Sequence, residues 1–410
     1  CGGIVMEKAN VTVWKRTEFV QVSTNPTKWE AKKIVKVGVV DEYKSLIWKE
    51  SCGDPGEFEL YIPMSTTAFD LFRINRVVTI DETFNTISDA DSGNHAILMA
   101  QPDAMIIEKI EITTDQEEGS YMIVSGRNWR TIFSRRVIGD EIGMWTTSLK
   151  QDVLEIGGKT TWNGFTFGIP IAMDNALWSN NSDYTDNDLT TGESWINMEA
   201  YDLMTELTRA KDSYWKLLFN PSNYYLAWLY IYRGVDRSGQ KDAPKIEISE
   251  DFDTIISSEY IVDYTDTKNA CLAVSEGEWY RRRYAWYDYK NAYIYDEEGN
   301  WDEFRERQMA IISDVPNTYE NGDMRPLYPD MEADLRAKGK AEIDKRYPTE
   351  TFTAEIQLNQ FIYRKDYFIG DRVKVKTSYG LELIATIDNV TRTWDDSGYH
   401  TDIQIRGGVA

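Results

Sequence analysis

The side chains that most often do chemistry in proteins are scarce in this sequence of 410 residues. It contains two histidines, His95 and His400, and three cysteines, Cys1, Cys52 and Cys271. Two histidines argue against a His-based catalytic triad or a His-rich zinc site, although a single acid–base histidine stays open. Three scattered cysteines supply neither a thiolate metal site nor a disulfide framework. We expect solvated histidines in polar turns, and inert buried thiols at Cys52 and Cys271.

Carboxylates are abundant, with 68 Asp and Glu residues in all. Two carboxylates are what glycoside hydrolysis requires, but among so many no pair stands out. Two polar segments carry oxygen ligands of the kind that calcium prefers, yet neither matches the twelve-residue loop that ends in a liganding Glu. Their aspartates are Asp89 and Asp91 in one segment, and Asp183, Asp186 and Asp188 in the other. We therefore predict no catalytic residue, no cofactor, no metal site and no enzyme activity.

The formal net charge of −23 argues against a surface that clamps nucleic acid, because phosphate binding needs clustered Lys and Arg. No run of eighteen apolar residues is present, so the sequence predicts no transmembrane segment. The 14 Trp and 25 Tyr residues are typical of the cores and cross-strand pairs of β-rich proteins. A chain of this length is expected to form two to four domains.

Residues 41–63 predict two paired strands around a tight turn. Apolar residues alternate with polar ones there, which is the period of a half-buried strand. They are Leu46 and Trp48 before the turn, and Phe58, Leu60 and Ile62 after it. The turn Asp54-Pro55-Gly56 joins the strands, since Pro presets φ and Gly tolerates a positive φ.

The remaining elements alternate short strands with a few helices. Amphipathic spacing predicts helices at 129–136, 196–207 and 329–346. Strand patterns occur at 34–40, 105–113, 121–126, 213–219, 224–234, 351–363, 371–377, 381–390 and 399–405. The predicted fold class is α+β and β-dominated, with two small antiparallel β-barrel domains and inserted α+β domains.

Four domains follow from this order of elements. We predict an N-terminal β-barrel domain at 1–150, an inserted α+β domain with an exposed polar loop at 151–245, a second β-rich domain ending in a helix at 246–346, and a C-terminal β-barrel domain at 347–410. The two terminal domains are expected to be structurally analogous, although their sequences show no repeat.

Five sequence blocks, in order over about residues 40 to 407, resemble the siphovirus ReqiPepy-type tail protein family. They are the DPGEF turn, the Ser-Gly-Arg and Arg-Arg segment, the Gly-x-Asp-Arg-Ser segment, the Lys-Asn segment, and the Gly-Asp turn before a Val-x-Val strand. Each block is weak alone, but five in sequence are specific. The residues that carry the resemblance are Asp54, Pro55, Gly56, Phe58, Gly126, Arg127, Arg135, Arg136, Asp236, Arg237, Lys268, Asn269, Gly370 and Asp371. The first 35 residues and residues 180–193 match nothing in this pattern.

The resemblance implies a phage tail-hub-like fold and a baseplate hub at the distal tail of a virion, assembled in the host cytoplasm. Such hubs form homotrimeric rings whose two barrels per chain match a sixfold tail tube. The implied partners are the tube-side ring protein of the distal tail, the tape-measure protein, and receptor-binding or fibre proteins. Stable nucleic-acid binding is not expected, because DNA must pass rather than stick.

Two other functions stay open. A host-wall carbohydrate-binding module of the tail would present aromatics such as Trp178, Trp195 or Trp301, and a peptidoglycan or polysaccharide hydrolase would use a carboxylate pair. Since the sequence ends soon after the C-terminal strands, we expect receptor binding or wall cleavage to reside in another protein. At the other end, processing before Met6 would explain a start at Cys1.

Overall fold

The computed structural model of the chain describes residues 9–24, 27–80, 95–99, 101, 103–115, 119–138, 153, 156, 171–178, 198–209, 213–222, 225–239, 245–249, 255–277, 281–288, 300, 302–319, 322–327, 331–346, 348–356, 361–377, 380 and 382–407. The chain forms two compact units. The first consists of Cys1–Glu259 and Phe352–Ala410, and the second, Tyr260–Thr351, is inserted between these segments.

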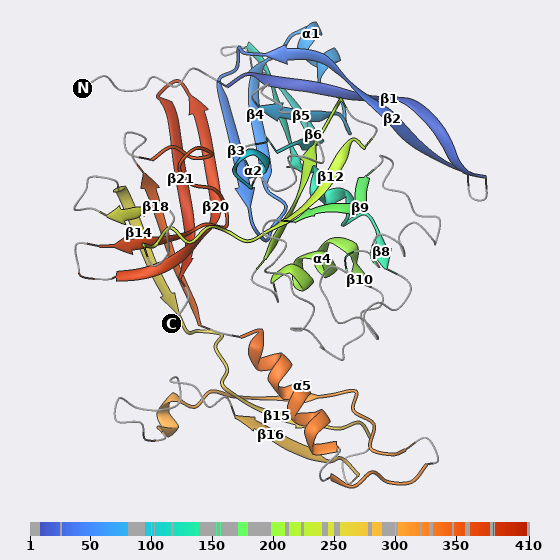
Figure 1. Ribbon diagram of the computed structural model, residues 1–410, viewed down its shortest axis with the longest axis vertical. Coiled ribbons are helices and arrows are strands. Elements are labelled where there is room, and N and C mark those ends of the chain that lie inside the picture. Colours follow the sequence, from blue (N-terminus) through green and yellow to red (C-terminus); the bar gives the residue numbers. More distant parts are fainter. Residues whose placement is uncertain are drawn as a thin grey trace. The chain divides into compact units, whose positions relative to one another are not determined.

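A 13-stranded sheet is the framework of the first unit (Figure 1). Its path runs β14-β18-β21-β20-β3-β4-β7-β6-β5-β1-β2, and β13 pairs with β19 beside it. The strands are β1 (Val11–Thr24), β2 (Thr27–Val40), β3 (Ser45–Ser51), β4 (Glu57–Pro63), β5 (Val77–Ile80), β6 (Met105–Asp115), β7 (Gly119–Asn128), β13 (Glu247–Ser249), β14 (Ile255–Asp263), β18 (Thr349–Ile356), β19 (Arg372–Lys376), β20 (Glu382–Asp395) and β21 (Gly398–Gly407). Segments from both ends of the sequence therefore meet in one sheet, because β20 pairs with β3 as well as with β21.

The hairpin predicted around residues 54–56 is present as β3 and β4. Leu46 lies opposite Leu60 and Trp48 opposite Phe58, and all four side chains are buried. The residues between them, which include Ile47 and Glu59, are more exposed, as the period of two requires. Two short helices accompany this part of the sheet, α1 (Thr66–Leu71) and α2 (His95–Met99). The hydroxyl of Ser65 accepts the Ala68 amide hydrogen at 3.0 Å and so caps α1.

A second, smaller sheet of the first unit has the order β11-β12-β9. Its strands are β9 (Ile171–Trp178), β11 (Tyr214–Phe219) and β12 (Ala227–Tyr232). Every residue of β11 and β12 is buried, which explains their nearly continuous apolar sequence. The 3₁₀ helix η2 (Trp129–Ile132) and helix α4 (Ala200–Arg209) share a core with β11, and β8 (Val137–Ile138) pairs with β10 (Met198–Glu199).

The second unit has a three-stranded sheet of its own. Strand β15 (Ala270–Val274) pairs antiparallel with β16 (Tyr284–Asp288) and parallel with β17 (Gln308–Ile312). The 3₁₀ helix η5 (Glu303–Arg305) precedes β17. Helix α5 (Glu332–Asp344) packs against β15 and β16, so closely that a Cβ on Gly339 would lie 3.0 Å from the Tyr287 Cβ. The core consists of Ala273, Ala285, Val315, Met331 and Leu335.

The β-dominated α+β class is confirmed. Closed barrels are not detected among the described strands, and β3 of the N-terminal part neighbours β20 of the C-terminal part in an open sheet. The physical reason is that the C-terminal strands complete the N-terminal sheet instead of closing on themselves. The four-domain division and the analogy between the terminal domains stay predictions. The aspartates of the two segments compared with calcium loops, Asp89, Asp91, Asp183, Asp186 and Asp188, lie outside the described residues.

Candidate functional site

Four of the motif residues lie at the turn between β3 and β4: Asp54, Pro55 and Gly56 in the turn itself, and Phe58 at the start of β4. Phe58 packs against Trp48, with ring centroids 5.8 Å apart. The expected positive φ at Gly56 is wrong, since its φ lies outside the left-handed region. Glycine is required there because of a close approach instead. A Cβ would lie 2.1 Å from the Lys49 carbonyl oxygen.

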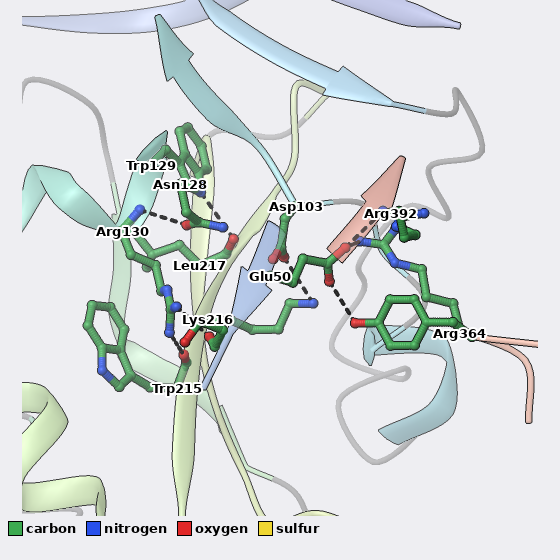
Figure 2. A network of polar contacts seen from close by, with 12 residues as sticks. Glu50, Asp103, Asn128, Trp129, Arg130, Trp215, Lys216, Leu217, Arg364 and Arg392 are labelled. Carbon is green, nitrogen blue, oxygen red and sulfur yellow. Dashed lines mark hydrogen bonds and ion pairs between the residues drawn. The ribbon is translucent and has the colours of Figure 1, made fainter. Parts of the chain in front are cut away.

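Arg130 fixes this turn from inside the protein. Its side chain is 3% exposed and donates hydrogen bonds to the carbonyl oxygens of Ser51 at 2.7 Å and Asp54 at 2.8 Å. A third bond, of 2.7 Å, reaches the Trp215 carbonyl on β11 (Figure 2). The guanidinium also lies 5.3 Å from the Trp215 ring centroid, within cation–π range. One buried cation thus links the β3–β4 hairpin to the smaller sheet.

Glu50 on β3 is the centre of a buried ion cluster next to that turn (Figure 2). Its Oε1 accepts bonds of 2.8 Å from both Arg364 and Arg392, and its Oε2 accepts a bond of 2.8 Å from the Tyr363 hydroxyl. Burial alone would raise the pKa of Glu50, but the charges of Arg364, Arg392 and Lys216 outweigh it and lower the pKa to about 2. Glu50 is therefore ionised in the folded protein above that pH.

A further ion pair lies beside this cluster. Lys216 on β11 contacts Asp103 at 3.1 Å, and both side chains are almost fully buried. Hydrogen bonds fix the neighbouring backbone. The Asn128 side chain accepts the Arg130 amide hydrogen at 2.9 Å, and the Trp129 indole donates to the Leu217 carbonyl at 3.0 Å. Figure 2 shows these groups directed toward one another. The two buried carboxylates of this network, Glu50 and Asp103, both have cationic partners. Such pairs hold together segments that are far apart in the sequence.

Two of the sequence blocks meet at a second buried junction. Asp371 is fully buried and accepts bonds from the Arg237 guanidinium at 2.6 Å and from the Val235 amide at 2.7 Å. Gly370 has a φ of +91°, and Gly234 allows the two segments to approach closely, because a Cβ on Gly234 would lie 1.7 Å from the Gly370 carbonyl oxygen. Asp236 closes its own turn by accepting the Ser238 amide hydrogen at 3.0 Å. The Gly-x-Asp-Arg-Ser and Gly-Asp blocks are therefore partners in space.

The Ser-Gly-Arg and Arg-Arg residues form a third group. Arg127 and Arg135 both contact Glu108, at 2.6 Å and 2.8 Å. Arg136 donates to the Arg135 carbonyl at 2.8 Å. Gly126 faces a bulge in β6, and a Cβ there would lie 1.8 Å from the Ile106 carbonyl oxygen. Of the Arg-Arg pair, Arg135 therefore has a carboxylate partner.

Lys268 and Asn269 belong to the second unit. The Asn269 side chain accepts the Arg307 amide hydrogen at 2.7 Å and donates to the Arg305 carbonyl at 3.0 Å, which joins the starts of β15 and β17. The Lys268 amide donates to the Arg346 carbonyl at 3.2 Å. The structure thus places the fourteen motif residues in several separate groups, and their role as defining residues of the family stays a prediction.

The expectation for His95 is wrong. It lies in α2, where its Nδ1 is 2.6 Å from the Tyr230 hydroxyl, and its ring is about 6.0 Å from those of Tyr230 and Tyr232. Burial, with the charges of Lys216 and Arg237, lowers the pKa of His95 to about 4. The polar sequence before it gave no sign of this packing. His400 is partly exposed on β21, with its Nε2 2.8 Å from the Ser397 hydroxyl.

Cys52 and Cys271 are buried free thiols, as expected, and burial raises the pKa of both. Within the described residues, no three His, Cys, Asp or Glu side chains come close enough to hold a metal ion. The same part of the chain contains no helix long and apolar enough to span a membrane. Of the aromatics suggested for glycan binding, Trp178 ends β9, and Trp195 and Trp301 lie outside the described residues.

Sequence reasoning missed Glu50, Arg130, Arg364 and Arg392. Each looks like an ordinary charged residue of a strand or turn, and its burial depends on a partner far along the chain. Glu50 and Arg392 are separated by 342 positions. The one available signal was that Arg130 directly follows Trp129 in a short amphipathic segment.

A family model described as Siphovirus ReqiPepy6 Gp37-like protein matches residues 171–408, which is more than half of the chain. The chain belongs to this Gp37-like family. It is thus a member of a phage tail protein family, as the five sequence blocks predict. No curated protein matches the sequence of this Gp37-like chain.

Solved structures share the fold of the Gp37-like chain along nearly its whole length. The 43 kDa tail protein of prophage MuSo2 from Shewanella oneidensis is similar with a TM-score of 0.52 and 12% identity, over 97% of this chain and 98% of that one. A tail protein from Neisseria meningitidis MC58 is similar with a TM-score of 0.52 and 10% identity, over 97% and 96%. At these identities the likeness establishes the fold.

Proposed function

We propose that this Gp37-like chain is a structural hub protein of the distal tail, or baseplate, of a siphophage or phage-like particle. Three copies form a ring that joins the tail tube to the tip and guides the tape-measure protein and the DNA at ejection. The observation that carries the proposal is the fold shared along 97% of the chain with a prophage tail protein. Family membership over residues 171–408 supports it independently.

The chemistry of the buried network supports a structural role. Glu50 and Asp103 are both engaged by cations, and the pKa of Glu50 is lowered, whereas a general acid at neutral pH needs a raised pKa. The Glu50–Arg392 pair joins β3 to β20, and the Lys216–Asp103 pair joins β11 to the segment just before β6. A ring component that must keep its shape under load needs fixed connections of this kind.

The proposed partners are the tube-side ring protein, the tape-measure protein, and the receptor-binding or fibre proteins. The acidic net charge of −23 is compatible with a lumen that does not retain DNA.

An image of the purified particle with this protein labelled tests the position. Label density confined to the distal end of the tail is expected, and label along the tube or at the capsid would overturn the proposal. Light scattering by the purified protein tests the trimer. Glycan binding by a stable monomer would favour a wall-binding module, and turnover of purified peptidoglycan or polysaccharide would favour a hydrolase.

A further inference from the structure

Strands β1 and β2 extend past the rest of the first unit as a long hairpin (Figure 1). Strand β1 pairs with β5 only from Val11 to Trp14, whereas its pairing with β2 continues to Thr24. We call residues 15–24 and 27–36 the arm. Among the described strands β2 is the last of its sheet, so the arm has two backbone edges without a neighbouring strand. Ten extended residues reach roughly 33 Å.

The arm presents large apolar side chains to solvent. Phe19 is 51% exposed and Trp29 is 55% exposed. Phe19 lies opposite Ala31, and Trp29 lies opposite Gln21, so the two aromatic residues share one face of the hairpin as diagonal neighbours. Val20, which is 45% exposed, lies on the other face. Aromatic side chains on a projecting ribbon are typical of a binding surface.

The charge of this hairpin is opposite to that of the rest of the chain. Residues 11–40 contain six Lys or Arg and two Glu, a net charge of +4, in a chain of net charge −23. All other residues together therefore carry −27. The surface most complementary to the hairpin is an acidic protein surface, and every further copy of this chain supplies one.

We propose that the arm is the contact through which one copy of this chain binds the next, its aromatic face and cations lying on the acidic first unit of the neighbour. The contact is heterologous, because the arm meets a different surface, and heterologous contacts close into rings when the rotation permits. The proposal rests on the ring-forming function proposed above. It adds that the arm is the segment that holds neighbouring copies in the ring together.

Polyanions are poorer partners for the same surface. Several of these cations already have partners within the arm: Lys32 pairs with Glu30, Lys33 pairs with Glu18, and Arg16 lies 6.0 Å from the Phe19 ring centroid. The charge of −27 on the remaining residues repels DNA and anionic lipid whenever they approach the arm. The same charge attracts the arm of another copy.

Light scattering after size-exclusion chromatography, over a range of protein concentrations and at low and high salt, tests the proposal. The arm variant is Phe19→Ser with Trp29→Ser. Its matched control is Ile74→Ser with Ile112→Ser, because these residues are 51% and 46% exposed on the same unit but outside the arm. We expect the parent and the control to self-associate equally. The arm variant should associate at least about tenfold more weakly, with an unchanged far-UV circular dichroism spectrum.

Two further variants test the chemistry of the contact. Trp29→Phe keeps an aromatic ring and should retain association. Lys15→Glu with Lys33→Glu removes the net positive charge, so association should weaken at low salt and lose most of its salt dependence.

The outcomes separate this proposal from the hub function. Association by the arm variant equal to that of the parent would overturn the arm contact and leave the hub intact. Arm-dependent association into a two-fold dimer would contradict both the heterologous contact and the trimer, and so would a monomeric parent under all conditions. If the arm variants lost binding to duplex DNA or anionic vesicles while the oligomer was unchanged, the arm would have another partner and the proposal would be overturned.

Discussion

At the scale of single residues, Glu50 makes a direct pH prediction. Its pKa is lowered from 4.5 to about 2 in the folded protein, so ionised Glu50 stabilises the fold above about pH 4.5 and loses that effect as the pH falls toward 2. Glu50→Gln leaves Arg364 and Arg392 buried without their carboxylate. We expect it to lower the free energy of unfolding by about 3 kcal/mol at pH 7.

Urea unfolding at neutral and at increasingly acidic pH, followed by tryptophan fluorescence, measures this difference, which should shrink as the pH approaches 2. The control is Glu57→Gln, because Glu57 is 64% exposed and contacts Lys49 at 3.5 Å. It should cost less than about 0.5 kcal/mol. A loss for Glu50→Gln that is the same at every pH would contradict the assigned ion cluster.

Positions 56 and 119 both require glycine, but for different reasons. Substitution by asparagine at each position distinguishes the two reasons. A Cβ at Gly56 meets a backbone carbonyl at 2.1 Å, whereas Gly119 has φ +84° and nothing within 4 Å. Asparagine tolerates the left-handed region, so Gly119→Asn should cost less than about 1 kcal/mol. Gly56→Asn should cost about 3 kcal/mol or more, because the β3–β4 turn must open. Thermal unfolding compares them, and equal melting temperatures would refute the steric explanation.

At the scale of elements, the sequence patterns predicted those strands and helices that depend mainly on residues close together in the sequence. The period of two in residues 45–63 placed β3 and β4, and the spacing of Leu203, Met204 and Leu207 placed α4. The candidate network was not predictable in the same way, because Glu50 becomes a buried ion only when β20 pairs with β3. The exposure of Phe19 and Trp29 was not predictable either, because an apolar residue in a strand pattern normally indicates a core position.

The inserted unit makes a prediction of its own. Residues Tyr260–Thr351 have a three-stranded sheet, helix α5 and a separate core around Ala273 and Leu335. We expect this fragment to fold alone, because its described pairings among β15, β16 and β17 are internal. Circular dichroism and a cooperative thermal transition check this. Asn269→Ala should lower the melting temperature of the fragment by several degrees, since two bonds between the residues that precede β15 and β17 are lost. A fragment without cooperative unfolding would refute its independence.

At the scale of the whole molecule, charge predicts weak interaction with DNA. Acidic residues outnumber Lys and Arg by 68 to 45, and non-specific binding depends on clustered cations. The basic run Arg281-Arg282-Arg283 is partly engaged, because Arg282 donates to the Gly277 carbonyl at 2.9 Å. We expect no measurable specific affinity for labelled duplex DNA at physiological salt. Tight binding that persists there, and that Arg281→Ala with Arg283→Ala abolishes, would reveal a phosphate site and contradict the proposal of a lumen that does not retain DNA.

The pairing of β20 with β3 also has a consequence for synthesis on the ribosome. Strand β3 is made early, but its neighbour β20 and the partners of Glu50 are made more than 300 positions later, and Arg392 follows Glu50 by 342 residues. At usual translation speeds this delay is roughly 20 to 70 s. During that time β3 has an open edge and Glu50 lacks its ion pairs with Arg364 and Arg392. A prematurely terminated chain therefore cannot complete the sheet, which would keep truncated products out of the assembled particle.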